Sequence, residues 1–348
     1  MGLTVQVAAK ALVFQRQDAP LSLVGHWVPM PLRGTVTALL PVSSQPPALL
    51  AATTNGVWHS TDAGATWQPD GSGTQGRAIF TLAGATNGAA AWAGSFDGTV
   101  YMRDSAGTRV SWRRISPVLR TDPFLGSVPI YSLAVSPLPG HPILVGSMGA
   151  IFRGEPNAGD RAWRWIRVWQ WPGGAHASPG SGAVTSLLAA PWDRHTIFAS
   201  LFEANPPVLI SHDDGRSWAS YAANLPASLP VQDLAAGTAP ARLIFLTTMG
   251  GGVWRREAGG AWQDISAGLP QRHAMPLVEV GPPSVGVLYA GTMASGVYEK
   301  VGNGAWRPLG RGLTGLAATV LGLVETTGAH PVLLAATTSG VYGYVPGR

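Results

Sequence analysis

The 348-residue chain contains no cysteine, which excludes disulfide bonds and any chemistry at a thiol. Charged residues make up only 12% of the chain, and just two of its 23 basic residues are lysine. No run approaches the roughly 18 consecutive apolar residues that a membrane-spanning helix requires, so we expect no membrane span. The first 25 residues lack an apolar core followed by a small-residue cleavage site, and this favours a cytoplasmic protein.

Glycine and proline, by contrast, are abundant, with 45 and 29 residues, as expected for a chain with many tight turns. Between the turns lie short runs of Val, Leu, Thr and aromatic residues, such as Val36–Leu40, Ile130–Val135 and Val184–Ala189. No window carries a sustained helical period. The sequence therefore predicts an all-β protein.

Tryptophan recurs at intervals of 44 to 55 residues, at Trp67, Trp112, Trp163, Trp218, Trp262 and Trp306. A second series, mostly a glycine followed by an apolar and an aromatic residue, precedes these tryptophans, as at Gly56–Trp58, Gly252–Trp254 and Gly296–Tyr298. A repeat of about 40–50 residues built from short strands is typical of a β-propeller.

The second series has seven copies and the first has six, since the chain ends shortly after Tyr342. The segment Gly25–Gly34 resembles Gly304–Gly312 and can supply the strand that the last repeat lacks, which removes exposed sheet edges. We predict one domain, residues 1–348, forming a seven-bladed β-propeller whose last blade is closed by an N-terminal strand. Short strands at Thr4–Val7 and Ala11–Phe14 are expected to lead into the closure. The predicted blades are residues 34–70, 78–117, 129–169, 183–225, 230–269, 274–313, and 318–348 with 24–31.

Two segments, 60–67 and 211–218, share the pattern Ser-x-Asp-x-Gly-x-Thr/Ser-Trp. The pattern predicts a hairpin turn in which the Asp accepts backbone N–H bonds, the Gly takes a positive φ, and the Trp packs between blades. It resembles the Asp-box, or BNR repeat, of sialidase-like propellers, and the resemblance implies a structural role at the outer edge of the ring. The residues expected to have this role are Ser60, Asp62, Gly64, Trp67, Ser211, Asp213, Gly215 and Trp218.

Three kinds of protein carry this repeat. Sialidases share the boxes, but this chain has no Arg-Ile-Pro motif near its start. Xyloglucan-active glycosidases are similar around Trp262–Pro270, yet they place two acidic residues across a cleft between two propellers. The sequence most resembles the photosystem II assembly-factor propellers and their BNR-like bacterial relatives, which are single seven-bladed rings. That resemblance implies a non-catalytic scaffold that binds a partner protein.

Positive charge is concentrated in residues 101–170, which hold nine arginines against four acidic residues. A one-sided arginine surface favours an acidic partner. With the period of a strand, Trp163, Trp165, Trp169 and Trp171 are expected to share one face with Arg161 and Arg167. The predicted partner-binding residues are Arg109, Arg113, Arg114, Arg120, Arg161, Arg164, Arg167, Trp169 and Trp171.

The central channel is the alternative site. Alignment of the inner strands places seven residues at one equivalent position, namely Ala38, Thr81, Ser132, Ser186, Asp233, Leu277 and Gly322. Asp233 is the one carboxylate among them, whereas glycoside hydrolysis ordinarily uses two. The alternative hypothesis is a glycan-binding or glycan-cleaving protein that uses Asp233, Arg272, His273, Glu279 and Glu325.

Metal and cofactor sites are not expected. The eight histidines are dispersed and lack the spacing of metal ligands. The chain also has no phosphate-binding glycine loop. Nucleic-acid binding is disfavoured, because the basic segment is modest and no recognition motif accompanies it.

Overall fold

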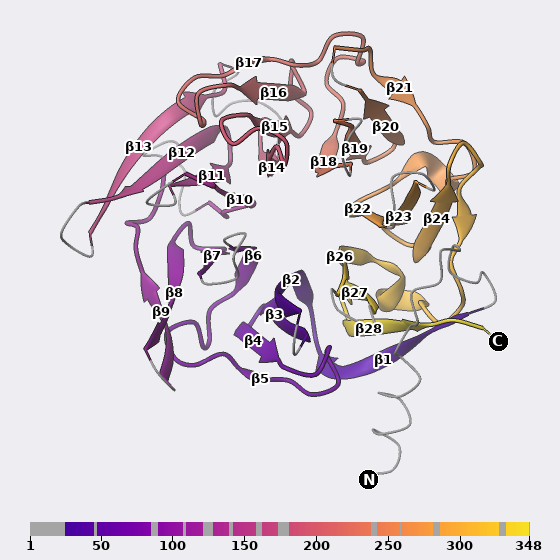
Figure 1. Cartoon of the computed structure of the whole chain (residues 1–348), viewed down its shortest axis with the longest axis horizontal. Helices are drawn as coiled ribbons and strands as arrows, with labels where there is room; N and C mark the ends of the chain where they lie inside the picture. The colour runs from indigo at the N-terminus through magenta and orange to yellow at the C-terminus, as the bar shows by residue number, and fades with distance from the viewer. Residues whose placement is uncertain are drawn as a thin grey trace.

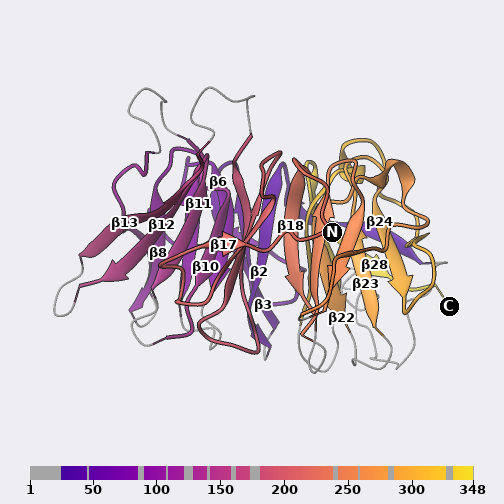
Figure 2. The ribbon, with the colours of Figure 1, turned by 90° about the horizontal axis from the view of Figure 1, so that it is seen from above.

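The computed structural model describes residues 25–44, 47–84, 90–106, 109–120, 128–138, 142–157, 162–172, 181–237, 242–257, 259–280, 286–326 and 332–347. These residues form seven four-stranded antiparallel sheets arranged as blades around a central axis (Figure 1). The strands cross the thickness of the ring, and their connections lie on its two faces (Figure 2). The seven-bladed all-β prediction is confirmed. Thr4–Val7 and Ala11–Phe14 lie outside the described residues.

Blades 1 to 3 follow one another along the chain. Blade 1 contains β2 (Val36–Ser44), β3 (Pro47–Thr53), β4 (Gly56–Ser60) and β5 (Gln68–Pro69). Blade 2 contains β6 (Ile79–Gly84), β7 (Ala91–Ser95), β8 (Val100–Ala106) and β9 (Arg109–Arg114). Blade 3 contains β10 (Ser132–Val135), β11 (Ile143–Ser147), β12 (Ala150–Pro156) and β13 (Trp163–Gln170).

Blades 4 to 6 repeat the plan, and blade 7 departs from it. Blade 4 contains β14 (Val184–Ala189), β15 (Ile197–Leu201), β16 (Val208–Ser211) and β17 (Ala219–Ser220). Blade 5 contains β18 (Val231–Ala236), β19 (Ile244–Thr248), β20 (Val253–Arg256) and β21 (Gln263–Asp264). Blade 6 contains β22 (Leu277–Val280), β23 (Val287–Gly291), β24 (Val297–Val301) and β25 (Arg307–Pro308). Blade 7 contains β26 (Val320–Glu325), β27 (Leu333–Thr337), β28 (Gly340–Val345) and β1 (His26–Arg33).

Two short 3₁₀ helices, η1 (Pro270–Arg272) and η2 (Gly315–Ala318), precede the inner strands of blades 6 and 7. Within the described ranges, no helix has the length and hydrophobicity to cross a membrane.

Blade 7 joins two distant parts of the sequence. Its strand order is β1-β28-β27-β26, with His26 opposite Val345 and Arg33 opposite Gly340. The Trp27 indole packs on Tyr344 with ring centroids 5.2 Å apart, and its Nε1 donates to the Leu309 carbonyl at 2.8 Å. Closure of the last blade by a strand from near the start of the sequence is therefore confirmed.

The second strand of each blade explains why the sequence uses nearly continuous apolar runs there. All five residues of β7, β11, β15, β19, β23 and β27 are buried, because a neighbouring blade covers each face of the sheet. Strands buried on both faces cannot alternate apolar and polar residues. The core consequently consists of clusters between blades rather than one central cluster.

Hydroxyl groups on the inner strands also connect neighbouring blades. Thr37 Oγ1 donates to the Ile79 carbonyl at 2.9 Å, and Ser132 Oγ donates to the Val184 carbonyl at 2.8 Å. Thr185 Oγ1 does the same to the Val231 carbonyl at 2.8 Å. Each bond joins one blade to the next around the channel.

The outermost strands differ in length. Those of blades 1, 4, 5 and 6 have two residues each, whereas β9 has six and β13 has eight. Blades 2 and 3 therefore extend farther from the axis than their neighbours (Figure 1). This extension carries most of the arginine-rich segment.

We predict that Trp27→Ala destabilises the protein by about 3–5 kcal/mol, because it removes a large buried side chain that contacts both β28 and blade 6. Urea unfolding measures the change. Leu316→Ala is the control, since Leu316 is 71% exposed and its truncation should cost under about 0.5 kcal/mol. Equal stability of the two variants would contradict the proposed importance of the closure.

Candidate functional site

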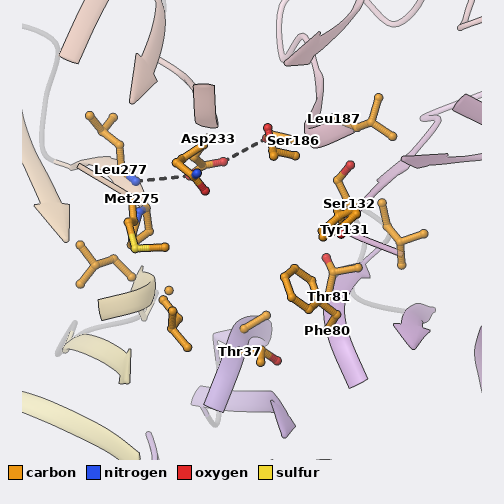
Figure 3. Close-up of a pocket in the computed structure, with 18 of the residues that line it drawn as sticks. Thr37, Phe80, Thr81, Tyr131, Ser132, Ser186, Leu187, Asp233, Met275 and Leu277 are labelled. Atoms are coloured by element: carbon orange, nitrogen blue, oxygen red, sulfur yellow. Dashed lines mark hydrogen bonds between the residues drawn. The ribbon is translucent and has the colours of Figure 1, made fainter. Parts of the chain in front are cut away.

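The seven inner strands enclose a cavity of about 470 Å³ on the axis of the ring (Figure 3). All seven positions that the sequence aligned line this cavity. The residue immediately before each of them also lines it, and this second set was not singled out from the sequence: Thr37, Phe80, Tyr131, Thr185, Gln232, Pro276 and Leu321. This second set could have been predicted from the sequence, because each of its members directly precedes an aligned position in the same inner strand.

Asp233, on β18, holds its carboxylate through three donors. Oδ1 accepts from Ser186 Oγ at 3.0 Å and from the Leu234 N–H at 2.9 Å, while Oδ2 accepts from the Leu277 N–H at 3.3 Å. The side chain faces the cavity but is enclosed by the surrounding strands. Burial removes water from the carboxylate and raises the pKa of Asp233 from 3.8 to about 6, because this effect outweighs the three hydrogen bonds, which lower the pKa.

Aromatic rings form the wall opposite Asp233 (Figure 3). Phe80 and Tyr131 meet edge to face with centroids 5.4 Å apart. The Phe96 ring packs on Phe80 with centroids 5.3 Å apart. Because Phe96 is 45% exposed, the aromatic cluster reaches from the cavity to the surface. Burial raises the pKa of the Tyr131 hydroxyl, which stays neutral at physiological pH.

The other predicted channel residues do not join Asp233 among the described residues that line the cavity. Arg272 ends η1 and is exposed, with Nη2 donating to Asp264 Oδ2 at 2.6 Å and to the Gly251 carbonyl at 2.9 Å. His273 follows Arg272 in the chain and forms an isolated antiparallel β-bridge with Met249 through the backbone. Glu279 and Glu325 lie two and three residues beyond the lining positions Leu277 and Gly322. Of the three acidic residues predicted for the channel, Asp233 is the one found among the described residues of the cavity lining.

The arginines of blades 2 and 3 divide into two groups. In the first group, Arg103 and Arg153 form ion pairs with aspartates of neighbouring blades. Arg103 binds Asp70 of blade 1 through two hydrogen bonds of 2.6 and 2.8 Å. Arg153 is 2% exposed and contacts Asp214 Oδ2 of blade 4 at 2.8 Å. These pairs connect blades, so part of the positive segment is neutralised within the protein.

The predicted partner-binding arginines are mostly at the surface. Arg113 is half-buried and pairs with Asp104 at 3.0 Å, while Arg161 lies outside the described residues. The exposed members are Arg109, Arg114, Arg120, Arg164 and Arg167. Arg114 Nε also donates to the Ser116 carbonyl at 2.7 Å.

The expectation that the four tryptophans share one face is wrong. In β13, Arg167 pairs with Phe152 but Trp169 pairs with Ile151, so Val168 is an extra residue in a β-bulge. A bulge of one residue transfers the following side chains to the other face of the sheet. Trp163 and Trp165 pack between blades 2 and 3, whereas the half-buried Trp169 and Trp171 pack between blades 3 and 4.

The two Ser-x-Asp-x-Gly turns lie at the outer edge of the ring, between the third and fourth strands of blades 1 and 4. Asp62 accepts from the Thr66 N–H at 2.8 Å, and Gly64 has φ +90°. Although burial opposes ionisation, hydrogen bonds from Ser217, Ser211 and backbone N–H groups lower the pKa of Asp213 to about 2. These carboxylates are occupied by their own turns, and the described part of the chain holds no group of three or more acidic or histidine side chains suited to a metal ion.

No protein-family model and no curated protein matches the sequence. Solved structures match its fold. An ancestral GH74 enzyme aligns with TM-score 0.68 at 16% identity, covering 94% of this chain and 46% of that enzyme. The Niastella koreensis GH74 enzyme aligns with TM-score 0.64 at 14% identity, covering 91% of this chain and 53% of that enzyme. The extracellular domain of a hybrid two-component system from B. thetaiotaomicron aligns with TM-score 0.65 at 12% identity. This alignment covers 92% of this chain and 40% of that domain's chain.

This chain thus spans about half or less of the length of each of these structures. At such identities the likeness shows the fold alone. The chain is a seven-bladed β-propeller with structural neighbours among the GH74 enzymes.

The pKa of Asp233 predicts a pH-dependent effect of Asp233→Asn. Because the folded-state pKa of about 6 exceeds the usual 3.8, the contribution of Asp233 to wild-type stability is greatest below pH 4 and is lost as the pH rises through 6. Asparagine does not ionise. The unfolding free energy of the variant relative to wild type should therefore rise by about 2 kcal/mol between pH 4 and pH 7. Urea unfolding across this range measures it, and a constant difference would contradict the assignment.

Proposed function

We propose that this propeller is a non-catalytic scaffold that binds an acidic partner protein at the seam between the outer strands of blades 2 and 3. The seam consists of Arg109, Arg113, Trp163, Trp165 and Arg167. The observation that carries the proposal is the register of β9 and β13, which points arginines from both strands toward the same seam.

The register gives the direction of each side chain, since paired residues in adjacent strands share a face. Arg167 pairs with Phe152, which packs in the cluster between blades 2 and 3. Arg113 pairs with Met102, which packs against the same cluster, and Arg109 shares that face of β9. Arg114 and Arg164 occupy the opposite faces of their strands.

Aromatic side chains form the floor of this seam. Trp163 and Trp165 are stacked with centroids 6.1 Å apart, and both are half-buried. Trp165 Nε1 donates to the Ile115 carbonyl of blade 2 at 2.9 Å, which fixes the two blades relative to each other. Arginine and tryptophan are the residue types that most often anchor protein interfaces. The resemblance to non-catalytic assembly-factor propellers supports the same function.

We predict that the double variant Arg109→Glu, Arg167→Glu captures at least tenfold less partner protein than wild type does from an extract of the source organism. Reversal of two seam charges replaces attraction of acidic side chains by repulsion. Quantitative mass spectrometry of material bound to the immobilised protein measures the loss. Capture by wild type should also weaken as the salt concentration rises.

The matched control is Arg114→Glu, Arg164→Glu, which makes the same change of charge on the same two strands but outside the seam. This control should retain capture. Equal losses in both variants would indicate nonspecific charge attraction, and no loss in either would refute the seam. Thermal melting of both variants checks that the ring remains folded.

A carbohydrate ligand in the central cavity is the second candidate function. It is favoured by the aromatic wall of Phe80 and Tyr131 and by the GH74 enzymes among the structural neighbours. Because Asp233 is the single acidic residue in the described cavity lining, we expect binding without cleavage.

Incubation of wild type and Asp233→Asn with a panel of β-glucans, xyloglucan and sialosides tests whether the cavity cleaves such a ligand. We expect no product from either protein in chromatography of the digests. Turnover by wild type that Asp233→Asn lacks would establish an enzyme and overturn the non-catalytic proposal.

A further inference from the structure

The charge of the cavity is unbalanced. Of the described side chains that line it, the Asp233 carboxylate is the one that is charged at neutral pH. The groups contacting it are the Ser186 hydroxyl of β14, the Leu277 N–H of β22 and the Leu234 N–H of its own strand, and its cross-strand partner is Thr247. None of these titrates, so a cation in the cavity would stabilise an otherwise poorly solvated anion.

Four hydroxyl groups of the wall already direct their protons to acceptors within the protein, so these four offer a ligand acceptor oxygen only. The hydroxyl protons of Thr37, Ser132 and Thr185 are directed to backbone carbonyls of the next blade. The Ser186 proton is directed to Asp233 Oδ1. A ligand that had to accept from these four hydroxyl groups would break their existing bonds, whereas a ligand that donates can reach the Asp233 carboxylate without such a cost.

The opposite wall suits an apolar or cationic group. Phe80 and Tyr131 lie across the cavity from Asp233 (Figure 3), and Phe96 extends the cluster to the surface. Met275 adds a polarisable side chain beside Asp233. Aromatic rings attract ammonium groups through their negative faces and also pack against hydrocarbon. A volume of about 470 Å³ lies within the usual range for small-ligand sites.

We propose that the central cavity binds an organic ammonium ion, with its N–H groups against the Asp233 carboxylate and its apolar body against Phe80 and Tyr131. This inference goes beyond the partner-binding scaffold and does not depend on it, because the seam and the cavity share no residue. It also specifies a ligand chemistry different from that of a neutral carbohydrate.

Isothermal titration calorimetry with three probes of nearly equal shape tests the charge requirement on wild-type protein. The probes are phenethylammonium, neutral 2-phenylethanol and anionic phenylacetate. At pH 7.5 the ammonium should bind at least tenfold more tightly than either of the other two. Equal affinities, no binding of the ammonium, or binding of glucose or a xyloglucan oligosaccharide in its place would overturn the proposal.

Asp233→Asn should weaken ammonium binding at least tenfold and leave 2-phenylethanol unaffected. Wild-type affinity should also fall as the pH is lowered from 7 to 5, because Asp233 becomes protonated, while Tyr131 stays neutral throughout. The Arg109→Glu, Arg167→Glu variant is the control and should bind the ammonium as wild type does. Unchanged binding by Asp233→Asn, or an affinity independent of pH, would refute the role of the carboxylate.

Discussion

The pairing of β1 with β28 is the interaction on which the rest of the molecule depends. Each blade buries both faces of its sheet against its neighbours, so no blade can complete its core unless the ring is closed. Trp27 shows this most directly, because it contacts Tyr344 within its own blade and the Leu309 carbonyl of blade 6. Closure also brings the seven inner strands around one axis, and the cavity exists only because they converge.

Polar contacts then set how neighbouring blades are aligned. The buried Arg153–Asp214 pair connects blade 3 to blade 4, and Arg103–Asp70 connects blade 2 to blade 1. Removing one member of such a pair leaves a buried charge without compensation, so these contacts restrict the blades to one relative position. Asp70 additionally accepts from Trp112 Nε1 at 2.9 Å. The arginine excess of this segment thus has an internal function as well as an external one.

The repeat spacing was sufficient to predict the blade number, the closure and the seven aligned positions of the cavity. Those features repeat with the same local geometry in every blade, so periodicity carries them. The bulge at Val168 could not be predicted this way, because one extra residue reverses the face without disturbing the apolar pattern. The pairing of Arg153 was also not predictable, since Asp214 lies in a different blade 61 residues away along the chain.

The two candidate surfaces have opposite charge and lie in different parts of the ring, and this separation argues for two independent binding functions. The seam lies at the outer strands of blades 2 and 3 and combines arginines with stacked, half-buried tryptophans. The cavity lies on the axis of the ring, and its described lining has one carboxylate, which lies across from aromatic rings. Both are positioned by strands and by bonds between blades, such as Trp165 to Ile115 and Ser186 to Asp233, rather than by long loops. A ligand at either site would therefore meet a wall that is already in place, and neither site requires the ring to change its shape.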